Sequence, residues 1–169
     1  VPGIGFAHTR LSLFDLSDAA TQPWVAGNDA LVFNGEIYNF VELRGHLEAA
    51  GRRFRTSSDT EVLFVALQEH GLEGALALIR GMFAFAFYDG ASRITHLCRD
   101  RYGIKPLVYT PLSGGVAFAS EVKAIMAVST PQYRRDPHAP SAAHYGRQVP
   151  DAHALPRPAP SRARFGGLG

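Results

Sequence analysis

The sequence predicts a mixed α+β domain, in which helices and β-hairpins come from successive runs of the chain. The clearest signal is a hairpin. Phenylalanines alternate with small residues over residues 82–88, Asp89-Gly90 forms a turn, and residues 93–98 return as the second strand. Helical spacing of apolar residues between positions 39 and 80 predicts three helices before it. With 169 residues, the chain is long enough to bury a sizeable core.

Ahead of the helices, residues 5–14 and residues 30–33 are expected to be strands, and residues 15–28 a loop. The second strand ends in Asn34-Gly35-Glu36, which is expected to open a turn. The first helix is predicted to begin at an asparagine cap and to end at a glycine. The cap is Asn39, the glycine is Gly51, and the apolar positions are Val41, Leu43, Leu47 and Ala50.

A second helix is predicted to begin at Ser58 or Asp59, and Ser58 with Glu61 fits a capping box. It is expected to stop at His70-Gly71, before a short helix over residues 72–80. The expected buried stripe consists of Val62, Leu63, Val65, Ala66 and Leu67.

After the first hairpin, a second hairpin is predicted, followed by a last helix. Its strands are residues 107–109 and 116–119, and the helix spans residues 120–126. The patterning then disappears: seven of the eleven prolines lie beyond residue 129, with six arginines and only two acidic residues. Such a composition buries too little apolar surface to offset its ordering entropy. The domain is therefore expected to span residues 1–129, and residues 130–169 to form a disordered Pro/Arg/Ala-rich tail.

Composition excludes several classes of function. A single cysteine, Cys98, excludes a disulfide framework and a multi-cysteine metal site, and the histidines lack ligand-like spacing, so we expect no metal. The net charge of +2 comes from the tail, which leaves the body without a nucleic-acid footprint. No apolar run approaches the roughly 18 residues that cross a membrane, and no signal-peptide pattern is present. We expect a cytoplasmic protein without nucleic-acid or membrane partners.

Asn34-Gly35-Glu36 is the most informative segment, and the residues alone leave two interpretations open. Asn-Gly is a common way of reversing the chain, so the segment is consistent with an ordinary turn. At the end of a strand, an asparagine side chain and backbone N–H groups can also converge on one ligand oxygen. An oxyanion hole requires that arrangement, with its donors fixed before charge develops on the substrate.

Six motifs lie in order within residues 5–127. They are His8-Thr9-Arg10-Leu11-Ser12, Asn34-Gly35-Glu36-Ile37-Tyr38-Asn39, Ser58-Asp59-Thr60-Glu61, Gly81-Met82-Phe83-Ala84-Phe85-Ala86, Arg99-Asp100-Arg101-Tyr102-Gly103-Ile104-Lys105-Pro106-Leu107 and Phe118-Ala119-Ser120-Glu121-Val122-Lys123-Ala124. With these motifs, the chain resembles the class II glutamine amidotransferase domain of asparagine synthetases.

The resemblance implies an N-terminal-nucleophile hydrolase fold, with two antiparallel β-sheets sandwiched between helices. It implies that the chain is a fragment of an enzyme that hydrolyses L-glutamine to glutamate and ammonia. In such enzymes a synthetase domain, missing from this chain, uses ATP and Mg²⁺ to convert aspartate to asparagine with that ammonia. No cofactor is expected in this chain itself.

The resemblance also assigns a glutamine site. Arg10 would hold the α-carboxylate, which a planar guanidinium suits, and residues 11–14 would line the site. Asn34 and the Gly35 N–H would form the oxyanion hole, and Glu36 and Asp59 would receive the α-ammonium group. The expected substrate-binding residues are Arg10, Leu11, Ser12, Leu13, Phe14, Asn34, Gly35, Glu36 and Asp59.

The family's nucleophile, a cysteine at the mature N-terminus, is not found in this sequence. Val1 carries no thiol or hydroxyl, and Cys98 lies in a predicted strand as a core residue. The 169 residues alone are therefore expected not to hydrolyse glutamine. Two alternatives stay open: a non-catalytic glutamine-binding module, and the amidotransferase domain of a related synthetase with a different acceptor.

Overall fold

A computed structural model of the chain describes residues 4–9, 21–128, 147–148 and 153–155. Within them lie three helices and eight strands. The helices are α1 (Phe40–Ala49), α2 (Asp59–Leu78) and α3 (Val122–Val128). The strands are β1 (Trp24–Ala26), β2 (Asp29–Ile37), β3 (Gly81–Asp89), β4 (Ile94–Arg99), β5 (Val108–Leu112), β6 (Gly115–Ala119), β7 (Arg147–Gln148) and β8 (His153–Leu155).

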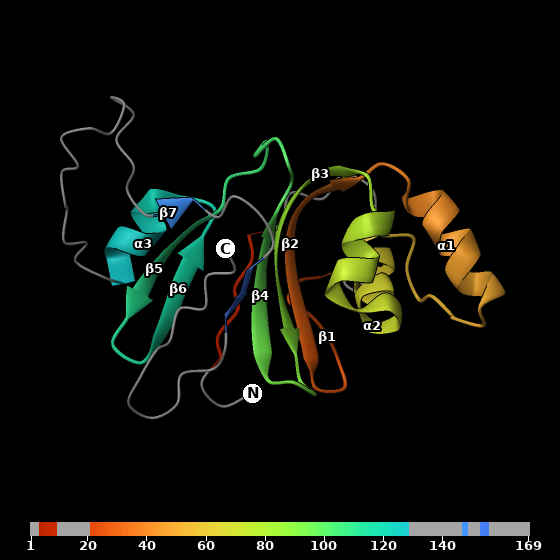
Figure 1. Ribbon diagram of the computed structural model, residues 1–169, viewed down its shortest axis with the longest axis horizontal. Coiled ribbons are helices and arrows are strands. Elements are labelled where there is room, and N and C mark those ends of the chain that lie inside the picture. Colours follow the sequence, from red (N-terminus) through yellow and green to blue (C-terminus); the bar gives the residue numbers. More distant parts are fainter. Residues whose placement is uncertain (1–3, 10–20, 129–146, 149–152, 156–169) are drawn as a thin grey trace.

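Two antiparallel sheets lie between helices (Figure 1). The larger sheet has the strand order β1-β2-β3-β4-β8, and the smaller one has the order β6-β5-β7. α2 packs on the larger sheet and α1 packs on α2, whereas α3 packs on β5 and β6 at the opposite end of the molecule. This confirms the predicted α+β class with two antiparallel sheets sandwiched between helices.

Alternation along β2 and β3 divides the core into two layers, because successive side chains of a strand point to opposite faces. The layer against α2 contains Leu31, Phe33, Ile37, Phe83, Phe85, Phe87 and Cys98, packed with Trp24 and Phe64. The layer between the sheets contains Val32, Ala84, Ala86, Leu97 and Leu107. The predicted phenylalanine face of the first hairpin is therefore confirmed, and it faces the helices.

β2 is longer than the sequence predicted. Asn34, Gly35 and Glu36 are strand residues, paired with Ala84, Phe83 and Met82, so the expected turn at this point is wrong. The reason is that β3 supplies a partner for β2 from Ala30 to Ile37, and this pairing overrides the local preference of Asn-Gly for a turn.

The region before β2 also differs from expectation. β1 occupies part of the predicted loop at residues 15–28 and pairs with the start of β2. Residues 5–9 form no strand ladder, contrary to the expected strand over residues 5–14. The rest of that segment lies outside the described residues.

The first helix was predicted correctly in position but not in its cap. Asn39 precedes α1, yet its side chain makes no cap hydrogen bond. Instead it donates to the Leu78 carbonyl and accepts from the Arg80 N–H, which ties the start of α1 to the end of α2. Leu43 and Leu47 are buried as predicted, but Val41 and Ala50 are exposed, because α1 covers α2 with only a narrow stripe.

The second helix begins as predicted, since the Ser58 hydroxyl accepts from the Thr60 N–H. The capping box is wrong. The Glu61 carboxylate turns to the preceding loop and accepts from the Arg55 and Thr56 N–H groups and the Thr56 hydroxyl. The predicted break appears as a kink at Gly71, whose φ is +68°. The predicted stripe is buried, with Val65 only half-buried.

Both predicted hairpins are present, as β3–β4 and β5–β6, and α3 follows the second. Residues 130–169 were expected to be disordered. Within them, β7 pairs with β5 and β8 pairs with β4, and the boundary at residue 129 stays a prediction. The remainder of the expected tail lies outside the described part of the chain.

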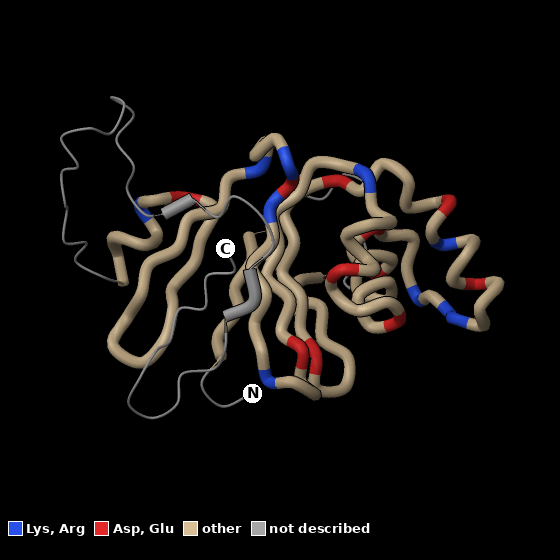
Figure 2. Tube along the Cα trace, viewed as in Figure 1, with Lys and Arg blue, Asp and Glu red and all other residues tan. Residues whose placement is uncertain are grey.

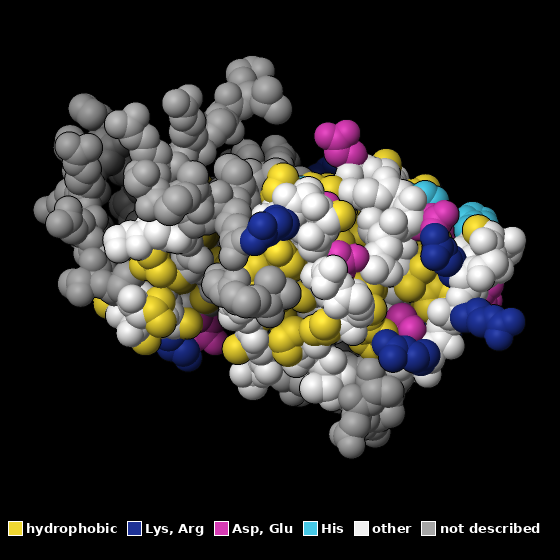
Figure 3. Space-filling view, turned by 90° about the horizontal axis from the view of Figure 1, so that it is seen from below, with side chains coloured by type: hydrophobic (Ala, Val, Ile, Leu, Met, Phe, Trp, Pro, Cys, Tyr) yellow, Lys and Arg dark blue, Asp and Glu magenta, His cyan; other side chains and the backbone are white. Residues whose placement is uncertain are grey.

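Charged residues are unevenly distributed over the described residues. β5 and β6 contain none, α2 carries acidic residues only, and α1 and the loops carry both signs (Figure 2). In the view of Figure 3, most visible charged side chains lie over the end formed by α1 and α2, and hydrophobic side chains reach the surface over the middle. No helix in the described part of the chain has the length and apolar character needed to cross a membrane.

The segment between β4 and β5 is organised by Asp100, which is buried. Its carboxylate accepts hydrogen bonds from the backbone N–H groups of Phe83, Tyr102, Ile104 and Lys105. Burial alone raises the pKa of this carboxyl group, but the four hydrogen bonds outweigh burial and hold the pKa below its usual value of 3.8.

Gly35 allows β2 and β3 to approach each other closely. It pairs with Phe83 and has a φ of +157°. A Cβ at this position would overlap the Met82 carbonyl oxygen and lie 2.7 Å from the Phe83 Cα. Both neighbours are backbone atoms, which cannot move aside as a flexible side chain does. Position 35 therefore requires glycine.

Asp100→Asn is expected to lower the free energy of unfolding by about 2–4 kcal/mol at neutral pH, because hydrogen bonds to a charged acceptor are lost. Since the folded-state pKa is lowered, this stabilisation is present above pH 3.8 and is lost as the pH falls through the folded pKa. Urea unfolding across this pH range measures the difference from wild type. The exposed Glu48→Gln on α1 is the control. A difference that does not shrink in acid would contradict the account.

Gly35→Ala is expected to destabilise the fold by about 3 kcal/mol, since overpacking and a strained backbone act together. Gly45→Ala is the matched control, because α1 has open space around that position. It is expected to be neutral or stabilising by about 0.5–1 kcal/mol, from helix propensity. Chemical denaturation compares the two variants. Equal stabilities would show that β2 and β3 separate at no cost.

Candidate functional site

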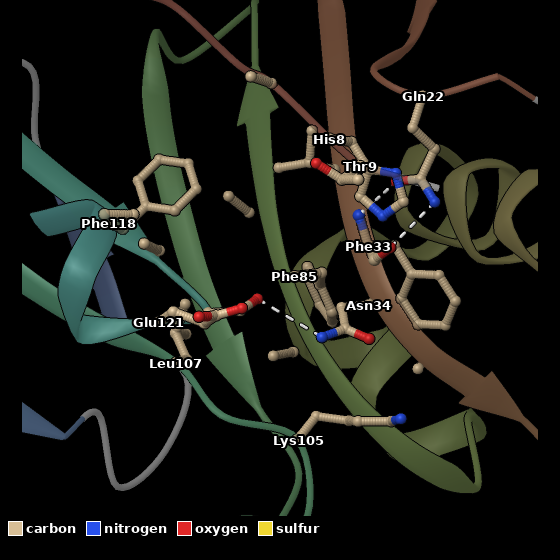
Figure 4. A pocket seen from close by; sticks show the side chains of 18 of the residues that line it. His8, Thr9, Gln22, Phe33, Asn34, Phe85, Lys105, Leu107, Phe118 and Glu121 are labelled. Carbon is tan, nitrogen blue, oxygen red and sulfur yellow. Dashed lines mark hydrogen bonds between the residues drawn. The ribbon is translucent and has the colours of Figure 1, made fainter. Parts of the chain in front are cut away.

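A cavity of about 900 Å³ lies between the two sheets. β2 and β3 bound it on one side, and the β5–β6 hairpin with α3 bounds it on the other (Figure 4). Its polar lining includes Gln22, Asn34, Glu36, Asp59, Lys105, Ser120 and Glu121. Four of the residues predicted from the sequence, Asn34, Gly35, Glu36 and Asp59, therefore line one space.

Asn34 lies on the face of β2 that points to the smaller sheet. Val32, two residues earlier, packs in the layer between the sheets, so alternation directs Asn34 to the same side. Its amide Nδ2 donates to the Ser120 hydroxyl over a long 3.4 Å (Figure 4). A hydrogen bond of this length is weak, so the amide is available to a ligand that offers a better acceptor.

The backbone N–H of Gly35 points away from β3. Tyr38 donates its N–H toward the β3 side, to the Arg80 carbonyl. The N–H groups of Phe33 and Ile37 point the other way, since they donate to the side chains of Gln22 and Asp59. Alternation along the strand gives Gly35 the same direction as Phe33 and Ile37. β1 pairs only with residues 29–31, so among the described residues no strand pairs with β2 on this edge at Gly35.

Asp59 lies at the first turn of α2, beside that edge. Its Oδ2 accepts the Ile37 N–H at 3.0 Å, and the residue is 9% exposed. Burial raises the pKa of this carboxyl group, and the negative charge of Glu36 raises it further. Hydrogen bonds from the Ile37 and Thr60 N–H groups lower the pKa but do not outweigh these effects, so the pKa lies above its usual value. A carboxylate accepts several hydrogen bonds, so Asp59 has capacity left for a cation in the cavity.

The charges around the cavity favour a ligand with a positive group near β2. Glu36 and Asp59 are both acidic and line the cavity there. Across the cavity, Glu121 is paired with Lys123 at 2.6 Å, and both are exposed. Among the described residues, no group of three or more His, Cys, Asp or Glu side chains is placed to hold a metal ion.

Cys98 is not part of this site. Its side chain packs in the layer against α2, on the face of β4 away from the cavity. Burial raises the pKa of its thiol to about 12, so the reactive thiolate is essentially absent at neutral pH. The prediction that Cys98 is a core residue is confirmed.

The predicted and the observed lining of the cavity differ at residues 10–14 and at Gln22. Arg10, Leu11, Ser12, Leu13 and Phe14 lie outside the described residues, so their predicted roles stay predictions. Gln22 was not predicted, although its carboxamide lies at the cavity (Figure 4). No sequence signal pointed to it, because its partner is backbone in a strand eleven residues away.

Known proteins match most of this chain in sequence. Asparagine synthetase [glutamine-hydrolyzing] 1 of Bacillus subtilis is 45% identical over 125 residues, which is 73% of this chain and 20% of that protein. Asparagine synthetase [glutamine-hydrolyzing] 2 of the same organism is 42% identical over 72% of this chain and 16% of that protein. Amidase chyE of Penicillium rubens is 36% identical over 73% of this chain and 18% of that protein. The chain thus spans about a fifth of the length of these relatives.

Solved structures give the same result for the fold. The glutamine phosphoribosylpyrophosphate amidotransferase from B. subtilis, complexed with ADP and GMP, superposes with a TM-score of 0.61 and 28% identity over 72% of this chain and 28% of that chain. The structure of the allosteric regulatory enzyme of purine biosynthesis superposes with a TM-score of 0.53 and 30% identity, over 59% of this chain and 23% of that chain. The fold is therefore of the N-terminal-nucleophile amidotransferase type, as expected.

A family model described as a glutamine amidotransferase domain matches residues 2–155, well over half of the chain. Together with the synthetase relatives, the shared fold and the converging residues of the cavity, this match shows that the chain belongs to the glutamine amidotransferase domain family.

Proposed function

We propose that the cavity binds L-glutamine and that the chain is the amidotransferase domain of a glutamine-hydrolysing asparagine synthetase. The observation that carries the first part is the convergence of Asn34, Gly35, Glu36 and Asp59 on one cavity. An amide side chain, a backbone N–H directed away from β3 and two carboxylates match the side-chain amide and the α-ammonium group of glutamine. The synthetase relatives support the second part.

In this proposal, the substrate amide lies at the edge of β2. The Asn34 Nδ2 and the Gly35 N–H donate to its carbonyl oxygen, and more strongly to the oxyanion that forms when a nucleophile adds to the carbonyl carbon. Asp59 and Glu36 bind the α-ammonium group, which fixes the substrate in one direction. Arg10 would hold the α-carboxylate, as the family resemblance implies.

The nucleophile is not supplied by Cys98, which is buried on the wrong face of β4. The proposal for this chain therefore concerns substrate binding and oxyanion stabilisation. ATP, Mg²⁺ and aspartate would act in a synthetase domain, which receives the ammonia. Formation of asparagine from aspartate, ATP and glutamine by the full-length protein is the assay for that acceptor.

A second candidate keeps the glutamine site and changes the acceptor. The 36% identity to amidase chyE favours it, since that relative is not named as an asparagine synthetase. Failure of the full-length protein to form asparagine, with glutamine binding retained, would select this candidate.

L-Glutamine is expected to raise the melting temperature of the chain, because a ligand that binds only the folded state stabilises it. D-Glutamine is the control ligand and is expected to have little effect, since with the amide in place it cannot direct its α-ammonium group to Asp59 and its α-carboxylate to Arg10 at the same time. Asn34→Ala is expected to weaken L-glutamine binding about fivefold, through loss of one hydrogen bond. Calorimetric titration measures this change. No stabilisation by L-glutamine, or an unchanged affinity in Asn34→Ala, would refute the site.

Glutamine affinity is expected to fall in acid, because the α-ammonium group needs an ionised Asp59. The pKa of Asp59 is raised, so the loss begins at a pH above 3.8. The stability of the free chain depends on pH in the opposite way. The contribution of Asp59 to the free energy of unfolding is greatest below pH 3.8 and declines as the pH rises through the raised pKa. Titrations at several pH values measure the affinity. Asp59→Asn is expected to bind weakly and without this pH dependence, and a parallel pH profile in that variant would contradict the assignment.

A further inference from the structure

Gln22 takes the place of a strand residue beside β2. The β1–β2 register pairs Trp24 with Leu31 and Val25 with Ala30, and its continuation brings position 22 opposite Phe33. There the Gln22 side chain makes both hydrogen bonds of a strand pair. Its Nε2 donates to the Phe33 carbonyl at 2.9 Å, and its Oε1 accepts the Phe33 N–H at 2.6 Å. A carboxamide has the donor and acceptor of a peptide group, so it continues the ladder where β1 has ended.

On the other side of Gly35, the Asp59 side chain likewise takes the place of a strand partner of β2. It accepts the N–H of Ile37, the next residue after Gly35 that faces this edge. Gly35 therefore lies between two residues whose backbone is fixed by side chains, while its own N–H faces the cavity edge. Without such anchors, glycine in an edge strand explores more conformations than any other residue.

We infer that Gln22 is a positioning residue for the oxyanion hole: its carboxamide fixes the edge of β2 so that the Gly35 N–H and the Asn34 side chain stay directed at the substrate carbonyl. This inference rests on the proposed glutamine site. Gln22 itself uses its Oε1 and one N–H of its amide on Phe33, so it acts through β2 rather than as a catalytic residue.

A purely structural role makes a different prediction. If Gln22 only closes the sheet edge, its loss lowers stability and leaves the bound state unchanged in the molecules that remain folded. If it positions the donors, its loss weakens glutamine binding in the folded molecules and makes the ligand-induced shift of the Gly35 amide resonance smaller. The two roles are separated by measuring binding and the Gly35 amide, in addition to stability.

The test uses Gln22→Met, which keeps the length of the side chain and removes both hydrogen bonds. The ¹⁵N-labelled chain is titrated with L-glutamine, and the Gly35 amide resonance and the Kd are followed. We expect a Kd about fivefold higher than that of the wild type and a much smaller ligand-induced shift of the Gly35 amide. Gln68→Met is the matched control. Gln68 is exposed on α2 and donates to Asp29, away from the cavity, so binding should not change.

Gln22→Glu provides a second variant. Its carboxylate still accepts the Phe33 N–H but cannot donate to the Phe33 carbonyl, so we expect a Kd between those of the wild type and Gln22→Met. If Gln22→Met does not fold, Gln22→Glu decides the question against wild type. An unchanged Kd and an unchanged Gly35 shift in the folded variant would overturn the inference alone. Absence of glutamine binding by the wild-type chain would instead overturn the proposed function, and this inference with it.

Discussion

The antiparallel pairing of β2 with β3 is the constraint on which the rest of the molecule depends. It runs from Ala30 to Ile37, and it decides which groups of β2 are used within the sheet and which remain for other partners. One face of β2 packs against the helical layer and the other borders the cavity; within the described part of the chain, no strand pairs with the edge of β2 beyond β1. The candidate site uses the groups of β2 that do not bond to β3, namely the side chains that face the cavity and the N–H groups on the edge away from β3.

The same pairing explains why the motifs predicted four residues that line one cavity but not the conformation of their backbone. The chemistry of Asn34, Gly35, Glu36 and Asp59 was readable from their motifs, and these residues do line one cavity. Their conformation was not readable, since Asn-Gly prefers turns locally, and the strand partner that overrides this preference lies about fifty residues later.

Elements with strong periodicity were predicted well, whereas side-chain contacts between elements were not. The alternation of Phe83, Phe85 and Phe87 correctly identified the core face of a hairpin. Asn39 and Glu61 both looked like caps of their own helices, but each bonds to a neighbouring segment. A cap and a tertiary hydrogen bond require the same residue types, so local spacing cannot distinguish them.

The loop after β4 is held by hydrogen bonds between its own residues. The Asp100 carboxylate accepts from backbone N–H groups of the loop, and the Arg99 guanidinium donates to the Gly103 and Lys105 carbonyls. Its tip is turned outward, with Tyr102 89% exposed and taking no part in that network through its side chain. Position 102 is thus suited to the attachment of a fluorescent label. A dye there would be held by a hydrogen-bonded loop and would not contact the core.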